Sequence, residues 1–383
     1  MSKYLDYQLQ RVVHCCPTRL KDSAHLLSEL KQLPQLPPGT QLATADAVSM
    51  YTNMDTTHVI DTINKWLHRH KRALPADLHI DLITEAISIV MTQNVFQFDD
   101  TFWIQTCGAA MGTSVACVLA TIYYSFHEES TILPTYGNGG PLLFYRRFID
   151  DGFIIWTPTI PYAPFDRFKS DLCFGKLTWT ADTPSNSVNF LDLTLSISNG
   201  FVTSKTYSKE HNLHLYLPPR SAHSPGVLKS LIYGNLQRYW KQNTHASDYT
   251  KMTSDFRQHL IARGHKSEDI DPIFLAAATH IDTAPERPTA NARSAPKLFL
   301  HWEYHPQDLP RHHIRTLFNE TCSSVLSEAR TPKGNKPQLG RLTIAYSKPK
   351  SIGNALCQTK MTEPLGHNVS DYVRTLSTAQ PSL

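Results

Sequence analysis

The sequence predicts an α+β fold: an antiparallel sheet with helices on one face, followed by a mainly helical region. Between residues 41 and 208, short β-prone runs joined by tight turns alternate with amphipathic helical patterns. Beyond residue 209 the strand pattern gives way to basic, helical pieces. The chain has 383 residues, 41% of them hydrophobic, which is enough for a large core and excludes a wholly disordered protein.

The helices are predicted from apolar residues spaced three and four apart and from signals at their ends. The clearest helix follows the capping residue Asp55 and carries Val59, Ile63 and Trp66 on one face. Other helices are expected over residues 20–33, 77–92 and 108–125. The last of these is the most apolar stretch, but it is broken by Ser and Thr, so we expect a buried helix and no membrane span.

Strands are predicted from short apolar runs bounded by turn residues. They are expected over residues 41–48, 142–149, 152–156, 176–179, 189–197 and 201–207. Two hairpins are expected, each with an acidic doublet at its turn. One spans residues 96–104 around Asp99-Asp100, and the other turns at Asp150-Asp151.

The charge distribution divides the chain into an acidic and a basic half. Residues 1–200 have a net charge of −5 and residues 201–383 a net charge of +9. Such asymmetry favours a partner that is a polyanion. The expected segments are an N-terminal helical segment (1–40), the sheet domain (41–208), a basic helical region with a connector (209–345) and a tail (346–383).

The seven cysteines are scattered, odd in number and without a zinc-binding spacing, which argues against a disulfide scaffold. The N-terminus Met-Ser-Lys-Tyr begins no apolar signal segment. We therefore expect an intracellular, non-secreted protein with no membrane partner.

Three carboxylates are the strongest candidates for chemistry. Asp46 ends an apolar strand, and Asp150-Asp151 lie inside a strongly apolar hairpin about a hundred residues later. Burying such charge is costly unless a metal ion or protons offset it. Asp99-Asp100 shows the alternative, because an acidic doublet between alternating residues can simply face water. Carboxylates that converge from separate strands are typical of sites that hold two divalent cations for phosphoryl transfer.

Four segments in order resemble the motifs of reverse transcriptases, most closely those of the Penelope-like elements. They are Ala45–Met54, Gln105–Thr113, Tyr145–Asp151 and Asn189–Leu193. The resemblance implies the palm of a right-hand polymerase, followed by a helical thumb, and an RNA-directed DNA polymerase encoded by a retrotransposon. It covers roughly residues 4 to 357.

The resemblance also implies roles for individual residues. Asp46 and Asp150 would bind two Mg²⁺ ions, or Mn²⁺ in their place, with the Ala47 carbonyl as a further ligand, and Asp151 would tune the site. Tyr51 would contact the incoming sugar and select deoxynucleotides. The residues expected to line the nucleotide and the template strand are Gln105, Gly108 and Gly112.

The implied partners are an RNA template, a DNA primer and dNTPs, in the nucleus or the cytoplasm. The basic residues expected to hold the template–primer duplex are Lys209, Lys229, Arg238 and Lys241. The segment before Asp46 is expected to be only a remnant of the fingers, and the GIY-YIG endonuclease common in this group is not seen. The alternative function is therefore a truncated, catalytically inactive remnant that only binds nucleic acid. The oligomeric state is not predicted.

Overall fold

The computed structural model describes residues 1–158, 164–219, 221, 223–224, 226–283, 297–305, 307–328 and 341–347. All but the first two residues of the expected tail (346–383) lie outside these ranges. The chain divides into two compact units. The first comprises Met1–Tyr216 and Gly234–Ala262, and the second comprises Leu217–Tyr233 and Arg263–Leu383. The segment boundaries drawn from the sequence stay predictions.

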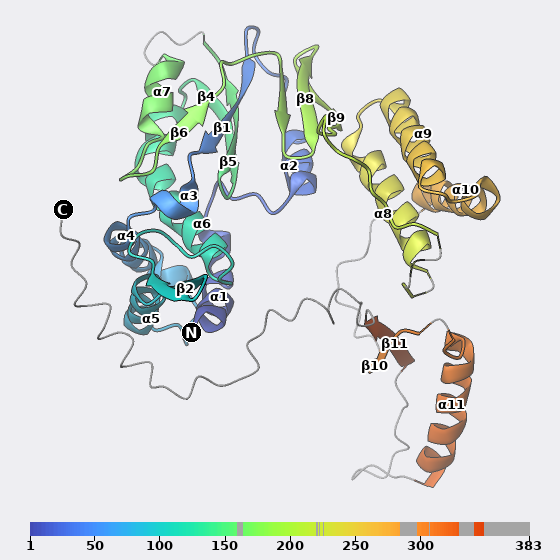
Figure 1. Cartoon of the computed structure of the whole chain (residues 1–383). Coiled ribbons are helices and arrows are strands. Elements are labelled where there is room, and N and C mark those ends of the chain that lie inside the picture. Colours follow the sequence, from blue (N-terminus) through green and yellow to red (C-terminus); the bar gives the residue numbers. More distant parts are fainter. Residues whose placement is uncertain are drawn as a thin grey trace. The chain divides into compact units, whose positions relative to one another are not determined.

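A four-stranded antiparallel sheet forms the centre of the first unit, in the order β4-β5-β1-β6 (Figure 1). Its strands are β1 (Gln41–Ala47), β4 (Leu142–Phe148), β5 (Asp151–Trp156) and β6 (Trp179–Ala181). β1 and β5 are the two interior strands, and β4 and β6 are the edges. Asp46 on β1 is paired with Asp151 on β5.

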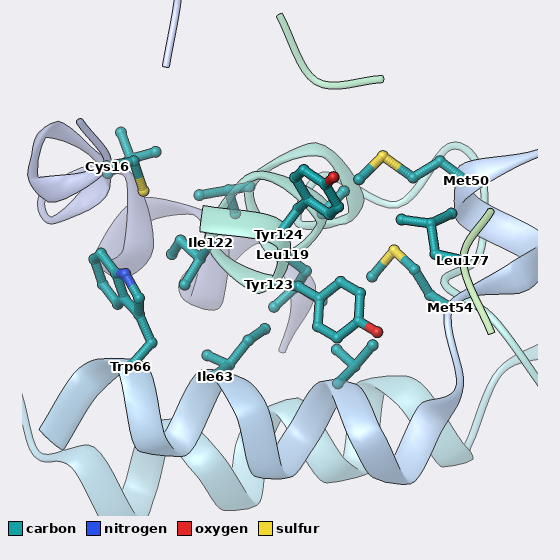
Figure 2. Packing of buried hydrophobic residues seen from close by; sticks show 14 of the residues in the cluster. Cys16, Met50, Met54, Ile63, Trp66, Leu119, Ile122, Tyr123, Tyr124 and Leu177 are labelled. Atoms are coloured by element: carbon teal, nitrogen blue, oxygen red, sulfur yellow. The ribbon is translucent and has the colours of Figure 1, made fainter. Parts of the chain in front are cut away.

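Side chains alternate between the two faces of β1. Ala43, Ala45 and Ala47 belong to a large core shared with helices. These helices are α1 (Ser2–Gln10), α3 (Met50–Asn53), α4 (Thr56–Arg69), α5 (Ile80–Thr92), α6 (Ala116–His127) and α7 (Phe165–Asp171). A short 3₁₀ turn, η1 (Val13–Cys15), also contributes to this core. Figure 2 shows Trp66, Ile122 and Met54 among the side chains of this core.

The other face of the sheet is covered over only part of its length. Leu42, Phe153 and Ile155 form a second core there. Its other members come from α2 (Ser23–Leu30), from the three-stranded antiparallel sheet β7-β8-β9, from β4 (Phe144) and from the segments on either side of α2 (Leu20 and Leu36). These strands are β7 (Ser187–Phe190), β8 (Leu193–Ser198) and β9 (Phe201–Thr206). The predicted α+β class, with helices on one face of an antiparallel sheet, is confirmed.

Three sequence-based elements are wrong in their extent. The strand expected over 176–179 is β6, at Trp179–Ala181. The helix expected over 108–125 begins only at Ala116, because Gly108 and Gly112 both have positive φ angles, which an α-helix does not allow. The single strand expected over 189–197 is a hairpin, because Leu191 adopts a left-handed conformation between β7 and β8. After α6 the chain continues as a π-helical segment, η3 (Glu128–Gly137), which the sequence patterns do not reveal.

The expected hairpin over residues 96–104 is present as β2 (Val95–Phe98) and β3 (Thr101–Ile104). Phe98 is 73% exposed and Trp103 50% exposed. Asp99, at the turn, has a positive φ. The hairpin therefore extends away from the core with its aromatic side chains in solvent.

The region after residue 209 is mainly helical, as predicted. Its helices are α8 (Val227–Gln242), α9 (Ala246–Ala262), α10 (Ser267–Thr283) and α11 (Arg311–Glu328). Within the first unit, Asn243 Nδ2 donates to Thr206 Oγ1, and Thr244 N donates to the Ser204 carbonyl. These bonds attach the end of α8 to β9. In the second unit, β10 (Lys297–Glu303) and β11 (Arg341–Ser347) pair in parallel. The first unit also contains a short 3₁₀ turn after α4, η2 (Lys71–Ala73).

Among the described residues, no helix has both the length and the apolar character needed to cross a bilayer. The six cysteines in the described ranges are all free. Cys357 lies outside the described residues.

Candidate active site

The three predicted carboxylates come together at one end of the central sheet. Asp46 and Asp151 are directly opposite one another on β1 and β5. Directly opposed residues of an antiparallel pair point to the same face, with their Cα atoms about 5 Å apart. Asp150 occupies the two-residue turn just before β5, and its carbonyl accepts a hydrogen bond from the Ala47 amide at 3.0 Å. Residues about a hundred positions apart in sequence thus form one acidic cluster.

Strand alternation places Asp46 and Asp151 on the face opposite the main helical layer. This is the face that carries Leu42 and Ile155 farther along the same strands. The second core ends before the acidic positions, and there the surface is hollowed into a cavity of about 120 Å³. The polar residues lining this cavity are Thr44, Asp46, Asp151, Thr180, Asp182 and Asn189.

The cavity also contains residues that motif reasoning did not single out. Asp182, just after β6, accepts a hydrogen bond from Thr44 Oγ1 at 2.6 Å. Leu191, with φ of +55°, contributes to the cavity wall next to Phe190. The sequence signal for Asp182 is weak, because an isolated acid after a three-residue strand is usually a solvated surface residue.

Burial, together with the crowding of negative charge, raises the pKa of two of the carboxyls. Burial, followed by the charges of Asp150 and Asp46, raises the pKa of Asp151 to about 6, and Lys209 acts in the opposite direction. Burial and the charge of Asp150 also raise the pKa of Asp46. The cluster is thus an electrostatically unfavourable arrangement that protons or a bound cation would relieve.

The donor set fits a hard divalent cation. All three side chains offer only carboxylate oxygens, which are the ligands that Mg²⁺ and Mn²⁺ favour. Within the described ranges, no three His, Cys, Asp or Glu side chains are already close enough to hold an ion as they stand. An ion would therefore require the carboxylates to turn towards one another from these backbone positions.

Tyr51 lies close to the acidic cluster on the short helix α3. Its hydroxyl is 3.2 Å from Cys117 Sγ, in the first turn of α6. Burial and this contact raise the pKa of Tyr51, and the charge of Asp150 contributes in the same direction. The Tyr51 side chain is partly exposed, so it contacts Cys117 and is still accessible from solvent.

The two predicted glycines differ in their surroundings. Gly108 packs against the backbone of α3, where an added Cβ would overlap the Tyr51 carbonyl oxygen, and the next amide, that of Ala109, donates to that oxygen at 2.7 Å. Gly112 has open space around it. Gln105 directly follows β3, and its Nε2 donates to the Cys107 carbonyl. The loop that bears these residues is thereby fixed against Tyr51 at Gly108.

The predicted basic residues are all exposed. Lys209 lies close enough to the acidic cluster to influence Asp151. Arg238 and Lys241 are on the part of α8 that belongs to the first unit, with the Arg238 guanidinium 5.4 Å from the centre of the Tyr239 ring. Lys229 belongs to the second unit, where its Nζ lies 5.3 Å from the Tyr233 ring.

No protein-family model and no curated protein sequence matches the chain. The chain is similar to solved structures of telomerase from Candida albicans with a fragment of telomeric RNA (11% identity, TM-score 0.47, covering 72% of this chain and 47% of that one). It is also similar to telomerase from Candida tropicalis with such a fragment (12%, 0.41, 73% and 47%). A third similar structure is the Sicinivirus 3Dpol RNA-dependent RNA polymerase (11%, 0.40, 67% and 54%).

The chain spans about half the length of these solved structures. Similarities of this size do not assign the chain to a family. The resemblance to Penelope-like elements stays a prediction from the sequence motifs.

Proposed function

We propose that this chain is a nucleic-acid polymerase, and specifically an RNA-directed DNA polymerase of a Penelope-like retroelement. The proposal is carried by one observation. Asp46 and Asp151 are paired across β1 and β5, with Asp150 in the adjoining turn, on the sheet face opposite the main helical layer and beyond the second core. The order of the four sequence motifs supports the finer assignment.

The proposed reaction extends a DNA primer along an RNA template. The primer 3′-hydroxyl oxygen forms a bond to the α-phosphorus of a dNTP, the bond to the β-phosphate bridging oxygen breaks, and pyrophosphate leaves with that electron pair. The hydroxyl proton passes to solvent. Bound Mg²⁺ or Mn²⁺ ions supply charge stabilisation for the attacking and the leaving oxygen.

The chain's own residues would hold the reactants. Asp46 and Asp150 would bind the cations, with the Ala47 carbonyl as a further ligand, and Asp151 would adjust the charge of the site. Tyr51 would place its ring against the sugar and exclude a 2′-hydroxyl. Gln105 would line the nucleotide and the template strand.

The exposed basic residues would bind the template–primer duplex through its phosphates. Those on the first unit are Lys209, Arg238 and Lys241, and Lys229 would contribute from the second unit. The same proposal implies an intracellular protein, nuclear or cytoplasmic, because its template and primer are found there.

A primer-extension assay on an RNA template tests the proposal. The wild-type chain, with Mg²⁺ or Mn²⁺ and dNTPs, should extend the primer, and Asp150→Ala should abolish extension. A matched control is Asp99→Ala/Asp100→Ala, since this doublet also occupies a hairpin turn but lies on the exposed β2–β3 hairpin. The control variant should retain activity.

Extension that survives Asp150→Ala would refute the assignment. Salt-dependent binding of the duplex without extension, under either cation, would instead support the alternative of a catalytically inactive remnant that binds nucleic acid.

A further inference from the structure

Arg147 and Glu128 form a fully buried ion pair beside the acidic turn. Arg147 is on β4 and Glu128 begins η3, and both side chains have no exposed surface. Arg147 Nε donates to Glu128 Oε1 at 2.7 Å, and Arg147 Nη2 donates to Glu128 Oε2 at 3.0 Å. Thr18 Oγ1 also donates to Glu128 Oε2, at 2.6 Å.

Two further guanidinium N–H groups of Arg147 bind backbone carbonyls. Nη2 donates to the Thr121 carbonyl at 2.9 Å, and Nη1 donates to the Ile149 carbonyl at 2.7 Å. Ile149 is the residue immediately before Asp150. One buried side chain therefore connects helix α6 directly to the turn that carries the candidate metal ligand.

The turn itself is conformationally strained. Phe148 pairs with Asp151, so Ile149 and Asp150 form a two-residue turn. Ile149 has φ of +56°, a left-handed conformation that costs an L residue about 1–2 kcal/mol, and β-branched residues rarely adopt it. Two-residue hairpin turns require this conformation and are usually built with Gly or Asn. Something in the surrounding structure must hold Ile149 there.

The hydrogen bonds around the turn show how it is held. The Ile149 carbonyl is bound by Arg147, and the Asp150 carbonyl is bound by the Ala47 amide. The peptide groups on both sides of the Asp150 Cα are thus fixed in orientation, and that orientation sets the direction in which the Asp150 side chain leaves the backbone.

A buried ion pair usually contributes little net free energy to folding. The desolvation of both charges often equals or exceeds their attraction, and replacing such a pair with apolar residues is frequently neutral or stabilising. The geometry points to another use. We propose that Arg147, oriented by Glu128, is a positioning residue that keeps Asp150 in its metal-binding direction by holding the left-handed Ile149 carbonyl. This inference rests on the proposed function of Asp150 as a metal ligand.

The test is the double apolar variant Arg147→Met/Glu128→Leu, which removes the hydrogen bond to Ile149 without leaving an unpaired buried charge. The matched control is Arg146→Met/Glu29→Leu. That pair comes from the neighbouring residue of β4 and has the same bidentate geometry, with Arg146 Nε 2.8 Å from Glu29 Oε2, but does not contact the turn.

Two properties of the whole chain are measured. Thermal unfolding gives its stability, and a titration followed by the electron paramagnetic resonance signal of free Mn²⁺ gives its affinity for the ion. The Arg147/Glu128 variant should unfold at or near the wild-type temperature, yet bind Mn²⁺ about tenfold or more weakly, as is usual when a group that orients a metal ligand is lost. The control variant should bind Mn²⁺ like the wild type.

Restoration provides a second measurement. Ile149→Gly, introduced into the Arg147/Glu128 variant, should recover part of the Mn²⁺ affinity, because Gly adopts positive φ without strain. Unchanged Mn²⁺ affinity in a folded double variant would overturn the inference while leaving the proposed function intact. A wild-type chain that binds no Mn²⁺ would overturn the proposed function, and the inference with it.

Discussion

Gly108→Ala should separate the loop of residues 105–115 from the helix that carries Tyr51. The new Cβ would overlap the Tyr51 carbonyl oxygen and lie 2.9 Å from the Thr52 Cα, and both contacts are with backbone that cannot rotate away. Gly108 also has φ of +84°, which costs Ala about 1–2 kcal/mol. If the loop moves to relieve the overlap, the 2.7 Å bond from the Ala109 amide to Tyr51 is lost, at about 1 kcal/mol.

The free energy of unfolding should therefore fall by about 2–3 kcal/mol in urea denaturation, the sum of these two contributions. Gly112→Ala is the matched control. Gly112 also has positive φ, at +92°, but an added Cβ there meets nothing within 4 Å, so only the conformational cost of about 1–2 kcal/mol applies. In primer extension, Gly108→Ala should raise the KM for dNTP more than Gly112→Ala does. Equal losses of stability in the two variants would show that the contact with α3 is not what requires a glycine.

Three further substitutions test the candidate site and the attachment of α8 to β9. In metal-free buffer at pH 7.5, Asp151→Asn should raise the free energy of unfolding by about 1 kcal/mol, a value reduced for the partial exposure of this carboxyl. Because the pKa of Asp151 is raised to about 6, its unfavourable charge appears as the pH rises from about 4 through 6. The gain in unfolding free energy from Asp151→Asn should therefore vanish at pH 4. An equal gain at pH 4 and pH 7.5 would contradict the electrostatic cause. Tyr51→Ala should allow incorporation of ribonucleotides whereas Tyr51→Phe should not, since only the ring is needed against the sugar; steady-state extension with rNTPs distinguishes them, and unchanged selectivity in the Ala variant would refute the role. Gln242→Ala should cost about 1–3 kcal/mol in urea denaturation, because buried Gln242 donates to Asp192 and accepts from Thr206, whereas exposed Lys241→Ala in the same turn should cost little; similar losses would argue against this contact.

The parts of the site that the sequence predicted are those that local patterns determine. The β-prone run before Asp46, and the two runs around Asp150-Asp151, each have a strong apolar signal, so the strands and the turn were correct. The convergence of the carboxylates is implied by the resemblance to the reverse transcriptase motifs, and the structure pairs Asp46 with Asp151. The helix around Gly108 was placed too early because small residues satisfy a helical pattern whether or not their backbone does.

What the sequence did not predict depends on contacts between distant residues. Nothing near Arg147 in the sequence indicates that its partner is Glu128 or that Thr18 completes the pair. An Arg-Arg dipeptide on a strand is usually read as exposed, and only the structure shows that the Arg147 side chain is fully buried. The left-handed Leu191, which converts one expected strand into a hairpin, is equally invisible, since Leu carries no turn signal.

The β2–β3 hairpin has a practical consequence for anyone preparing this protein. Phe96, Phe98 and Trp103 are each at least half exposed on it, and the chain has no Lys or Arg at all between Arg72 and Arg146 to keep neighbouring molecules apart by positive charge. This hairpin should therefore limit the solubility of the protein. We expect the protein to adsorb to hydrophobic resins and to self-associate at high concentration. Replacing Phe98 with Lys, at the rim of the turn and far from the carboxylates in sequence, is the first change to make before crystallisation.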